Sequence, residues 1–219
     1  MSKLKDIFRK IVSKLKKAKI LMLHYVQTDN NELSPCILST DNFYKVFGEN
    51  KKYISLDTLL SSSAKKYDGG VVITIDDGLF DLYTIAYPYL TNKGIPFTAY
   101  ISADLIGKDG YVTADQVVEM SKNPLVTIAS HGCTHKCLDE LTIKEQEYEI
   151  FSSKQKLEEL IGKPVEHYSY SNGRFTKDTI KLVKKAGYKS AVGVIPRVYN
   201  KLTKKRYDLP RINITDKTV

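Results

Sequence analysis

Acidic and imidazole side chains cluster where two short apolar segments of the sequence end. The apolar segment 71–75 ends in Asp76-Asp77-Gly78, and the segment 126–130 ends in His131-Gly-Cys-Thr-His135. Two imidazoles and one carboxylate form a donor set suited to a catalytic divalent metal that keeps one coordination position for water. The second carboxylate is then available as a general base beside that water. The pattern therefore indicates metal-assisted hydrolysis.

The elements predicted around these residues would bring them to one edge of a sheet. Strand and helix patterns alternate along the chain, which is typical of α/β proteins with a parallel sheet, whose sites form at the carboxyl ends of the strands. The expected strands are 20–26, 53–56, 71–75, 97–102, 126–130, 165–170, 189–194 and 209–214. The expected helices are 40–47, 57–66, 81–93, 114–122, 142–161 and 176–186. No linker or repeat divides the chain, so we expect one domain.

The remaining two histidines have different places in this scheme. His24 lies near the end of strand 20–26, on the same predicted rim as the aspartates, whereas His167 lies inside strand 165–170. We interpret His167 as a buried, hydrogen-bonded histidine. His24 is either a structural histidine or a member of the site.

The spacing His-x-x-x-His puts two imidazoles on one side of a helical turn, which is a spacing known from zinc sites. Cys133 and Cys137 allow a rival interpretation as a structural zinc site. In a helical turn Cys133 would point about 200° away from His131, so all four side chains could converge only in an irregular loop. We interpret both cysteines as small apolar residues.

Composition places the chain among ordinary globular proteins. Of its 219 residues, 42% are hydrophobic and 27% are charged, which argues against a largely disordered chain. No apolar run approaches the roughly 18 residues of a membrane-spanning helix. Three cysteines are too few, and odd in number, for a disulfide framework, which favours a reducing compartment.

The basic excess is concentrated in residues 1–19. This segment carries eight lysines and arginines against one aspartate, and so holds +7 of the formal net charge of +9. Apolar residues recur in it at helical spacing, which predicts a basic amphipathic helix over residues 1–18. The helix could pack on its own domain, or its residues 3–18 could contact an anionic membrane surface. No nucleic-acid partner is expected, because the other 200 residues carry only +2.

Taken together, the motifs resemble those of the polysaccharide deacetylases, the NodB homology domain of carbohydrate esterase family 4. Residues 72–78 (VITIDDG) and 128–135 (IASHGCTH) resemble the first two motifs of the family. Residues 21–26 and 53–56 are similar to the early segments of one branch, and residues 186–192 and 209–212 are similar to the late motifs. The resemblance covers about residues 19–214, and the ordered set of motifs is highly specific.

The resemblance implies a distorted, incomplete (β/α) barrel of about seven strands, as a single domain over residues 19–219. It also implies metal-dependent removal of an N- or O-acyl group from a sugar. Asp77, His131 and His135 would bind the metal, for which we expect zinc, with cobalt, nickel or manganese as alternatives. Asp76 would be the general base.

The sequence departs from the family pattern in two places. The third motif reads SYSNG at residues 169–173, so the arginine that orients the base in the family is absent at Ser169. We expect Arg211, in the late motif, to replace it and to pair with Asp76. No histidine follows His167, so the late histidine that acts as the acid in many members has no counterpart. His24 is our candidate for that acid.

Substrate contacts are expected from further residues near the predicted rim. The backbone N–H of Asn172 would help to form the oxyanion hole of the family. The rings of Tyr25 and Tyr170, together with that of Tyr100, are candidates for stacking on a sugar.

The function predicted from the sequence is sugar N-deacetylation, or deformylation of a lipid-linked amino sugar, as a step in glycan biosynthesis. Two alternatives are a carbohydrate-binding relative without activity and a membrane-associated partner protein that uses only the basic helix. Lysines interrupt any apolar core in that helix, so it does not look like a secretory signal. We therefore expect a cytoplasmic protein that could associate peripherally with the inner membrane surface.

Overall fold

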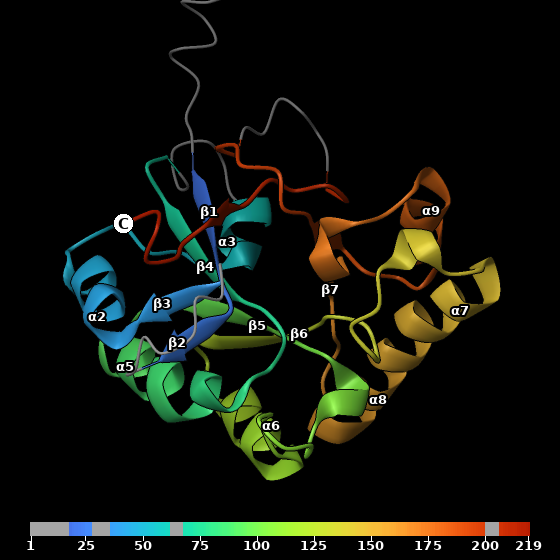
Figure 1. The fold of residues 1–219 in the computed structure, drawn as a ribbon, viewed down its shortest axis with the longest axis horizontal. Coiled ribbons are helices and arrows are strands. Elements are labelled where there is room, and N and C mark those ends of the chain that lie inside the picture. The colour runs from blue at the N-terminus through green and yellow to red at the C-terminus, as the bar shows by residue number, and fades with distance from the viewer. Residues whose placement is uncertain (1–17, 28–35, 62–67, 200–205) are drawn as a thin grey trace, which may run out of the picture.

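A curled parallel sheet forms the centre of the protein (Figure 1). The structure is a computed structural model that describes residues 18–27, 36–61, 68–199 and 206–219. Within these residues, seven strands form one parallel sheet in the order β8-β7-β6-β5-β4-β1-β9. They are β1 (Lys19–Leu23), β4 (Val71–Ile75), β5 (Phe97–Ile101), β6 (Val126–Ser130), β7 (His167–Ser169), β8 (Ser190–Val192) and β9 (Ile212–Asn213). The α/β class and the incomplete barrel are confirmed.

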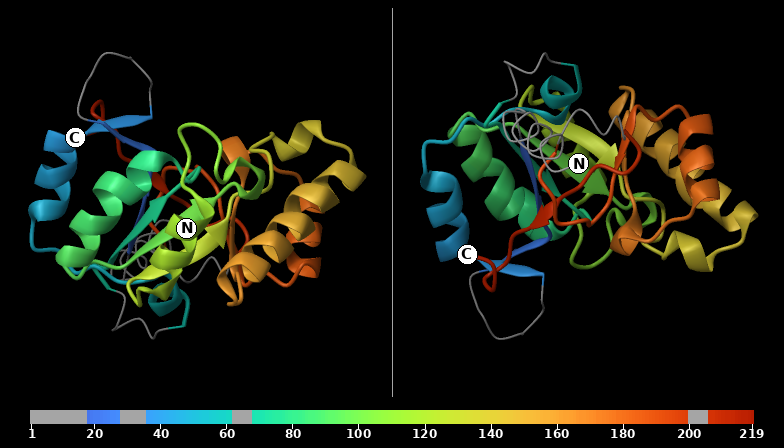
Figure 2. Two further views of the ribbon diagram at one scale, coloured as in Figure 1. Left: turned by 90° about the horizontal axis from the view of Figure 1, so that it is seen from below. Right: turned by 90° about the horizontal axis from the view of Figure 1, so that it is seen from above.

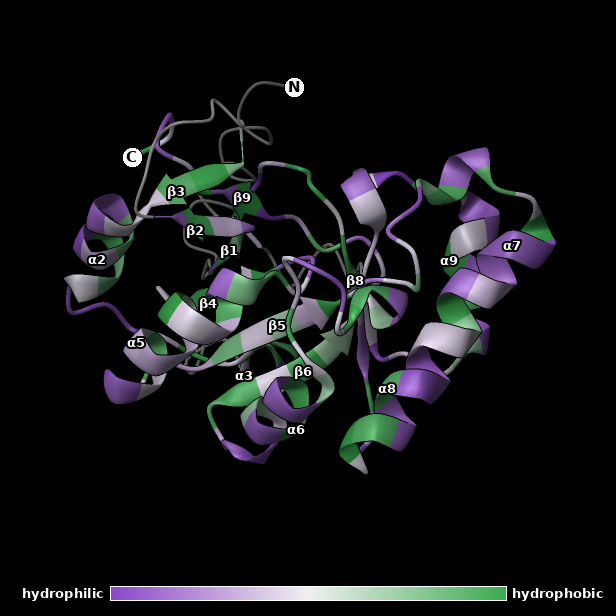
Figure 3. Ribbon diagram, turned by 60° about the horizontal axis from the view of Figure 1, so that its bottom comes forward, coloured by the Kyte–Doolittle hydropathy of each residue, from purple (hydrophilic) through white to green (hydrophobic). Residues whose placement is uncertain are grey.

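Helices cover the outer side of the curled sheet (Figures 1 and 2). The segments on this side are η1 (Leu82–Ala86), α5 (Tyr87–Asn92), α6 (Ala114–Lys122), α7 (Ile143–Glu147), η4 (Tyr148–Ser152), α8 (Ser153–Ile161) and α9 (Lys177–Lys185). Purple and green residues alternate around α7, α8 and α9 in Figure 3, as expected for helices that bury one face. A shorter helix, α3 (Leu56–Ser61), buries its leucines in a separate cluster with residues from the inner side of the sheet.

Alternation along the strands decides which side chains line the inside of the barrel. Successive side chains of a strand point to opposite faces. Ile73 and Ile75 belong to the large core beneath the outer helices, whereas Val72 belongs to the inner cluster with α3. Continuing from Val72, Thr74 and then Asp76 take the inner face. The sequence of β4 therefore aims one carboxylate into the mouth of the barrel.

The C-terminal segment spans the gap between the two edges of the sheet. Leu209 forms a parallel bridge with Val192 of β8, and three residues later Ile212 pairs with Leu21 of β1. Arg211 lies between these two anchor points and its side chain is fully buried. The segment thus delivers an arginine to the interior of the barrel.

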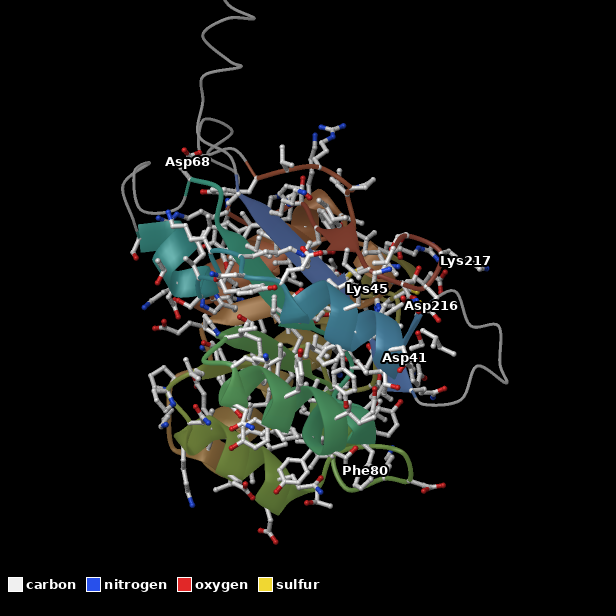
Figure 4. All side chains as sticks on the ribbon, turned by 90° about the vertical axis from the view of Figure 1, so that its left-hand side faces the viewer. Asp41, Lys45, Asp68, Phe80, Asp216 and Lys217 are labelled. Carbon is white, nitrogen blue, oxygen red and sulfur yellow. The ribbon has the colours of Figure 1, made fainter. Side chains whose placement is uncertain are left out.

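Beyond β9, the chain reaches a small outer unit. This unit contains β2 (Tyr25–Gln27) and β3 (Ile37–Ser39), which pair in parallel, and α2 (Thr40–Gly48). Asp216 Oδ1 accepts hydrogen bonds from the Ser39 N–H and hydroxyl groups and from Asn42 Nδ2, at 2.8, 2.9 and 2.9 Å. Figure 4 shows Asp216 beside α2, whose Asp41 and Lys45 are labelled. The C-terminus therefore holds the start of this helix.

Several predicted elements differ from those observed. The strand predicted over 20–26 is interrupted at His24, where the chain leaves the main sheet so that β2 can pair with β3. The strand predicted over 53–56 is reduced to a bridge at Tyr53, because α3 begins at Leu56. The N-cap of α2 is Ser39, whose hydroxyl accepts the Asn42 N–H. Capping boxes at Thr113 and Thr142 begin α6 and α7, at or next to the predicted helix starts 114 and 142.

Candidate functional site

The polar residues that follow β1, β4, β6 and β7 meet at one rim of the barrel. These strands are parallel, so their carboxyl ends lie at the same edge of the sheet. Leu23 of β1 pairs with Ile75 of β4, and its carbonyl accepts the Asp76 N–H at 2.9 Å. His24 and Asp76 therefore leave the sheet side by side.

Asp77, His131 and His135 converge on a common point. Asp77 Oδ1 lies 3.2 Å from His131 Nε2 and 3.0 Å from His135 Nε2. The same oxygen is buried and makes no well-aligned hydrogen bond within the described part of the chain. Burial opposes its ionisation, but the two imidazoles outweigh this and hold the pKa of Asp77 far below its usual range. A buried oxygen that faces two ring nitrogens is the arrangement expected of a metal site, so the three residues could hold a divalent cation.

His131 is held in the orientation that such a site needs. Its Nδ1 lies 2.9 Å from the Ser169 carbonyl oxygen, and because this oxygen can only accept, Nδ1 carries the proton. The lone pair of Nε2 is then directed toward Asp77. Burial would lower the pKa of His131, but the charges of Asp76 and Asp77 raise it overall. Metal-binding histidines commonly have such a backbone acceptor behind them.

The loop that carries the two histidines is irregular, and the predicted helical turn is wrong. Gly132 and His135 both have positive φ angles, 78° and 62°. These conformations turn both imidazoles toward Asp77 without a helix. The cysteines stay outside the donor set: buried Cys133 lies near the Tyr148 carbonyl, and Cys137 accepts a contact from Asn172 Nδ2 at 3.3 Å. The rival structural zinc site is therefore not formed by this loop.

Asp76 forms a buried, bidentate ion pair with Arg211. Arg211 Nη1 donates to Asp76 Oδ1 at 2.6 Å, and Nη2 donates to Oδ2 at 2.7 Å. Burial alone would raise the pKa of Asp76, but the charges of Arg211 and His131 and the Arg211 hydrogen bonds hold it below its usual range. Asp76 is therefore an ionised carboxylate, and its Oδ2 lies 3.9 Å from His131 Nε2. The pairing expected between Arg211 and Asp76 is present.

Further hydrogen bonds fix the guanidinium of Arg211. Nε donates to the Gly193 carbonyl at 2.8 Å, Nη1 also donates to Thr74 Oγ1 at 3.1 Å, and Nη2 donates to Ser169 Oγ at 3.0 Å. The Ser169 hydroxyl in turn donates to Asp76 Oδ2 at 3.1 Å. The serine in the third motif thus fills the space beside Asp76 while Arg211 reaches the carboxylate from the C-terminal segment.

His24 and Tyr25 lie within electrostatic reach of the same residues. Burial lowers the pKa of His24, while the charges of Asp76 and Asp77 raise it to a lesser extent. Its Nδ1 is buried and has no hydrogen-bond partner in the part of the chain that the structure describes. Burial and then the charge of Asp77 raise the pKa of Tyr25. His24 directly follows β1 at the rim, and Tyr25 begins β2 next to it.

The structure does not place Tyr170 or Tyr100 where a sugar could stack on them. Both are fully buried. The Tyr170 ring stacks on Phe175 with the centroids 4.1 Å apart, and its hydroxyl donates to the Tyr207 carbonyl at 3.0 Å. Burial in the core removes both rings from the predicted substrate contacts. His167 is buried as expected, between Ser190 Oγ at 2.8 Å and Asp57 Oδ1 at 3.1 Å.

Asn172 lies at the surface of the short turn η5 (Ser171–Gly173) that follows β7. It has a positive φ of 55°, which asparagine tolerates better than most residues. A side chain at Gly173 would bring its Cβ to 2.2 Å from Val194, so this position requires glycine. The turn is linked to the histidine loop, since the Ser171 hydroxyl donates to the His131 carbonyl at 3.4 Å.

Two residues near the site were missed by the sequence analysis. Tyr111 belongs to the loop 107–112, which is hydrogen bonded to the segment after Asp77 through Phe80 N–H to Gly110 O and Val112 N–H to Gly78 O. Figure 4 shows Phe80 at the surface beside this loop. Tyr111 forms an antiparallel bridge with Leu79, two residues after Asp77, and burial and then the charge of Asp77 raise the pKa of Tyr111. The second missed residue is Glu149, which binds the histidine loop.

Comparison with known proteins assigns the family. A family model described as polysaccharide deacetylase matches residues 63–191, more than half of the chain. The chain therefore belongs to the polysaccharide deacetylase family, as its motifs predict. The Bacillus subtilis (strain 168) protein YxkH, which carries the provisional name of a polysaccharide deacetylase, is 32% identical over 138 residues. This match covers 63% of the chain and 49% of YxkH, so it spans about half the length of that relative.

Solved structures of deacetylases share the fold. The Streptococcus pyogenes deacetylase PplD, in complex with acetate, superposes with a TM-score of 0.80 and 23% identity over 92% of this chain and 94% of its own. The polysaccharide deacetylase BC0361 from Bacillus cereus gives a TM-score of 0.76 and 23% identity over 91% of this chain and 65% of its own. Among the described residues, no helix is both long and apolar enough to cross a membrane. The basic segment 1–17 lies outside those residues.

Proposed function

We propose that this protein is a metal-dependent hydrolase that removes an acetyl or formyl group from an amino sugar of a polysaccharide or glycolipid precursor. The observation that carries the proposal is the convergence of Asp77, His131 and His135 beside an ionised carboxylate, Asp76. Two nitrogen donors and one oxygen donor suit zinc, with cobalt, nickel or manganese as alternatives. The bound cation would supply Lewis acidity to the acyl carbonyl and to the attacking water.

In this proposal, Asp76 accepts a proton from the attacking water. Arg211 keeps Asp76 ionised, and its fork of hydrogen bonds fixes the direction of both carboxylate oxygens. The water oxygen bonds to the carbonyl carbon, the bond from that carbon to the sugar nitrogen breaks, and the proton passes to the leaving amine. The Asn172 N–H is the donor that we assign to the tetrahedral oxyanion. We assign Tyr25 and Tyr111 as candidate contacts for the sugar, and the effect of the Asp77 charge on the pKa of each supports this assignment.

The proposed ligands predict how metal content depends on single substitutions. His135→Ala removes one of three protein donors, and because that side chain is partly exposed the fold should survive. We expect zinc content after dialysis to fall to a small fraction of the wild-type value, with acetate release lost in parallel. Cys137→Ser changes a neighbouring thiol outside the donor set and should keep the metal. A His135→Ala protein with full metal content would remove His135 from the ligands.

The activity itself is tested by acetate or formate release from acylated amino sugars by the metal-loaded protein. Release that disappears with chelation and returns with zinc supports the proposal. Metal binding without release from any acylated amino sugar would instead favour a carbohydrate-binding relative that has lost catalysis.

His24 is the residue that we propose for transferring the proton to the leaving amine. Burial lowers the pKa of His24, so the proton for the amine has to reach it during the reaction: Asp76 passes on the proton that it took from the water, and His24 gives it to the leaving amine. His24→Ala is expected to keep the metal and to lower kcat by about 10²-fold, in line with a lost acid–base group. His167→Gln, a change at the histidine outside the site, should leave kcat within about twofold in the folded protein. An unchanged kcat for His24→Ala would contradict the assignment.

A further inference from the structure

The loop from His131 to His135 cannot hold its shape by local interactions alone. Its positive φ at His135, 62°, is uncommon for a residue with a side chain and persists only where the surroundings enforce it. Both proposed imidazole ligands depend on this shape, because the loop is irregular between them. The contacts that enforce it therefore bear directly on the metal site.

A buried glutamate supplies these contacts. Glu149 is 3% exposed, and its Oε2 accepts the Cys133 N–H at 2.6 Å and the Thr134 N–H at 2.9 Å. Its Oε1 accepts the Thr134 hydroxyl. Three donors from two consecutive loop residues thus point at one carboxylate. This carboxylate fixes the backbone between the two histidines.

The position of Glu149 is itself well defined. It lies in η4, a π-helical stretch, and such stretches often occur at functional sites. The Ser153 hydroxyl donates to the Glu149 carbonyl at 2.5 Å and accepts a hydrogen bond from the Ser130 hydroxyl at 2.8 Å. Ser130 is the last residue of β6, and its Oγ accepts the Gly132 N–H at 3.2 Å. The helix, the strand end and the loop are therefore linked through hydroxyl groups.

Gly132 leaves the space that the carboxylate occupies. A Cβ at this position would lie 2.8 Å from Glu149 Oε2, and the φ of 78° disfavours any side chain there. On the other side of the loop, the Gly132 and Cys133 carbonyls accept the Ala103 and Asp104 N–H groups, both at 2.9 Å. The loop is thus held from two sides, with Glu149 as the buried charged group.

From this geometry we propose that Glu149 is a positioning residue that sets His131 and His135 in place for a divalent cation before the cation binds. The proposal rests on the metal site assigned above. Among the described residues, the Glu149 carboxylate is hydrogen bonded to the loop backbone and to the Thr134 hydroxyl, and not to a proposed ligand side chain, so it acts through the ligands. Holding the ligands in place removes the ordering that metal binding would otherwise have to impose. Its loss should therefore appear in metal affinity, independently of catalysis.

The experiment measures zinc affinity of the metal-free full chain by competition with a chromophoric chelator. Glu149→Ala is expected to weaken zinc binding about 10- to 100-fold, as for other groups that orient metal ligands. Glu149→Gln keeps one carbonyl oxygen for the two N–H donors and should recover part of this loss. The absorption spectrum of the cobalt-loaded protein should also change in Glu149→Ala, because its ligands are less well fixed.

Glu145 offers a matched control four residues away. Its carboxylate accepts the Thr142 N–H at 2.8 Å and the Thr142 hydroxyl at 2.6 Å, so it binds a threonine as Glu149 does, but at a helix start. Glu145→Ala should lower thermal stability and leave zinc affinity within about twofold of wild type. Equal zinc affinity in folded Glu149→Ala and wild type would overturn the proposal.

The remaining outcomes are also decisive. If Glu149→Ala does not fold, Thr134→Val, which removes a single donor to Glu149, is the deciding variant. A fall in zinc affinity of at least about threefold supports the proposal, and an unchanged affinity overturns it. If the wild-type chain itself binds no zinc, cobalt, nickel or manganese, then the metal site fails and the role of Glu149 fails with it. If wild type binds zinc and the variants bind it equally, only the role of Glu149 fails.

Discussion

Asp76→Asn is expected to lower the rate of acetyl release by about 10²- to 10⁴-fold while the protein keeps its metal, as for a lost general base. The amide cannot take a proton from water at neutral pH. Asp76 lies farther from the imidazoles than Asp77 does, because its Oδ2 is 3.9 Å from His131 Nε2. Both oxygens of Asp76 also accept hydrogen bonds from Arg211, so we do not expect Asp76 to be a metal ligand. Metal analysis and kcat on the same preparation check both parts of this expectation.

The control for Asp76→Asn is another aspartate that pairs with a buried side chain. Asp57 Oδ1 lies 3.1 Å from Nε2 of buried His167, away from the rim. Asp57→Asn should therefore change stability without changing kcat. A loss of metal from Asp76→Asn equal to that from Asp77→Ala would make Asp76 a ligand. A rate within about tenfold of wild type would remove it as the base.

The residues of the rim were predictable because sheet geometry alone brings them together. Asp76, Asp77 and His131 follow β4 and β6, whose bounds agree with the predicted segments 71–75 and 126–130. These are short apolar runs bounded by turn residues, the kind of segment whose limits are clearest in a sequence. Parallel pairing then places their ends at one edge without any further information.

The shape of the histidine loop was not predictable from spacing. A separation of four residues suits a helical turn, but the loop takes its shape from Glu149, which lies 16 residues beyond Cys133. Glu149 lies on a helix face that the structure buries, together with Gln146, Ile150 and Ser153, but three of these four residues are polar and do not mark the face as buried in the sequence. A glutamate at such a position needs partners, and the sequence does not say which ones.

Arg211 illustrates the difference between local pattern and tertiary contact. It lies 135 residues from Asp76, and no periodicity connects the two. The expectation that they pair came from the resemblance to a family with an arginine beside the base. The prediction that Tyr170 stacks on a sugar is wrong because of another tertiary contact: its position within the third motif does not reveal that the ring is buried against Phe175.

Arg211→Met is expected to destabilise the metal-free protein by about 3–5 kcal/mol, because it leaves Asp76 as an unpaired charge in the interior. The guanidinium is 0% exposed and methionine fills much of its volume, so the loss reflects the charge and hydrogen bonds rather than an empty space. Arg211→Lys keeps the positive charge but not the two parallel N–H donors, so it should recover only part of the lost free energy of unfolding. Denaturant unfolding of protein from which a chelator has removed any metal measures this change in the free energy of unfolding.

The pH dependence of this loss has a definite sign. The folded-state pKa of Asp76 lies below its unfolded value, so the ion pair contributes its full stability above about pH 4 and loses it as the pH falls through the folded pKa. The difference in the free energy of unfolding between wild type and Arg211→Met should therefore be largest near neutral pH and become smaller in acid. Arg174→Met is the control, because exposed Arg174 also bridges two carboxylates, Asp139 and Glu140, and should change stability little at any pH.

Removing both members of the pair separates the two explanations for a loss of stability. If Arg211→Met is harmful because Asp76 is left buried and charged, then Asp76→Leu in the same chain should restore part of the lost stability. If Arg211 instead matters mainly for its hydrogen bonds to Gly193, Thr74 and Ser169, the second change should add to the damage. We expect the double variant to be more stable than Arg211→Met alone, since a buried unpaired carboxylate is the costlier defect. If the double variant instead loses as much unfolding free energy as Arg211→Met and Asp76→Leu lose together, the ion pair is not the main contribution of Arg211 to stability.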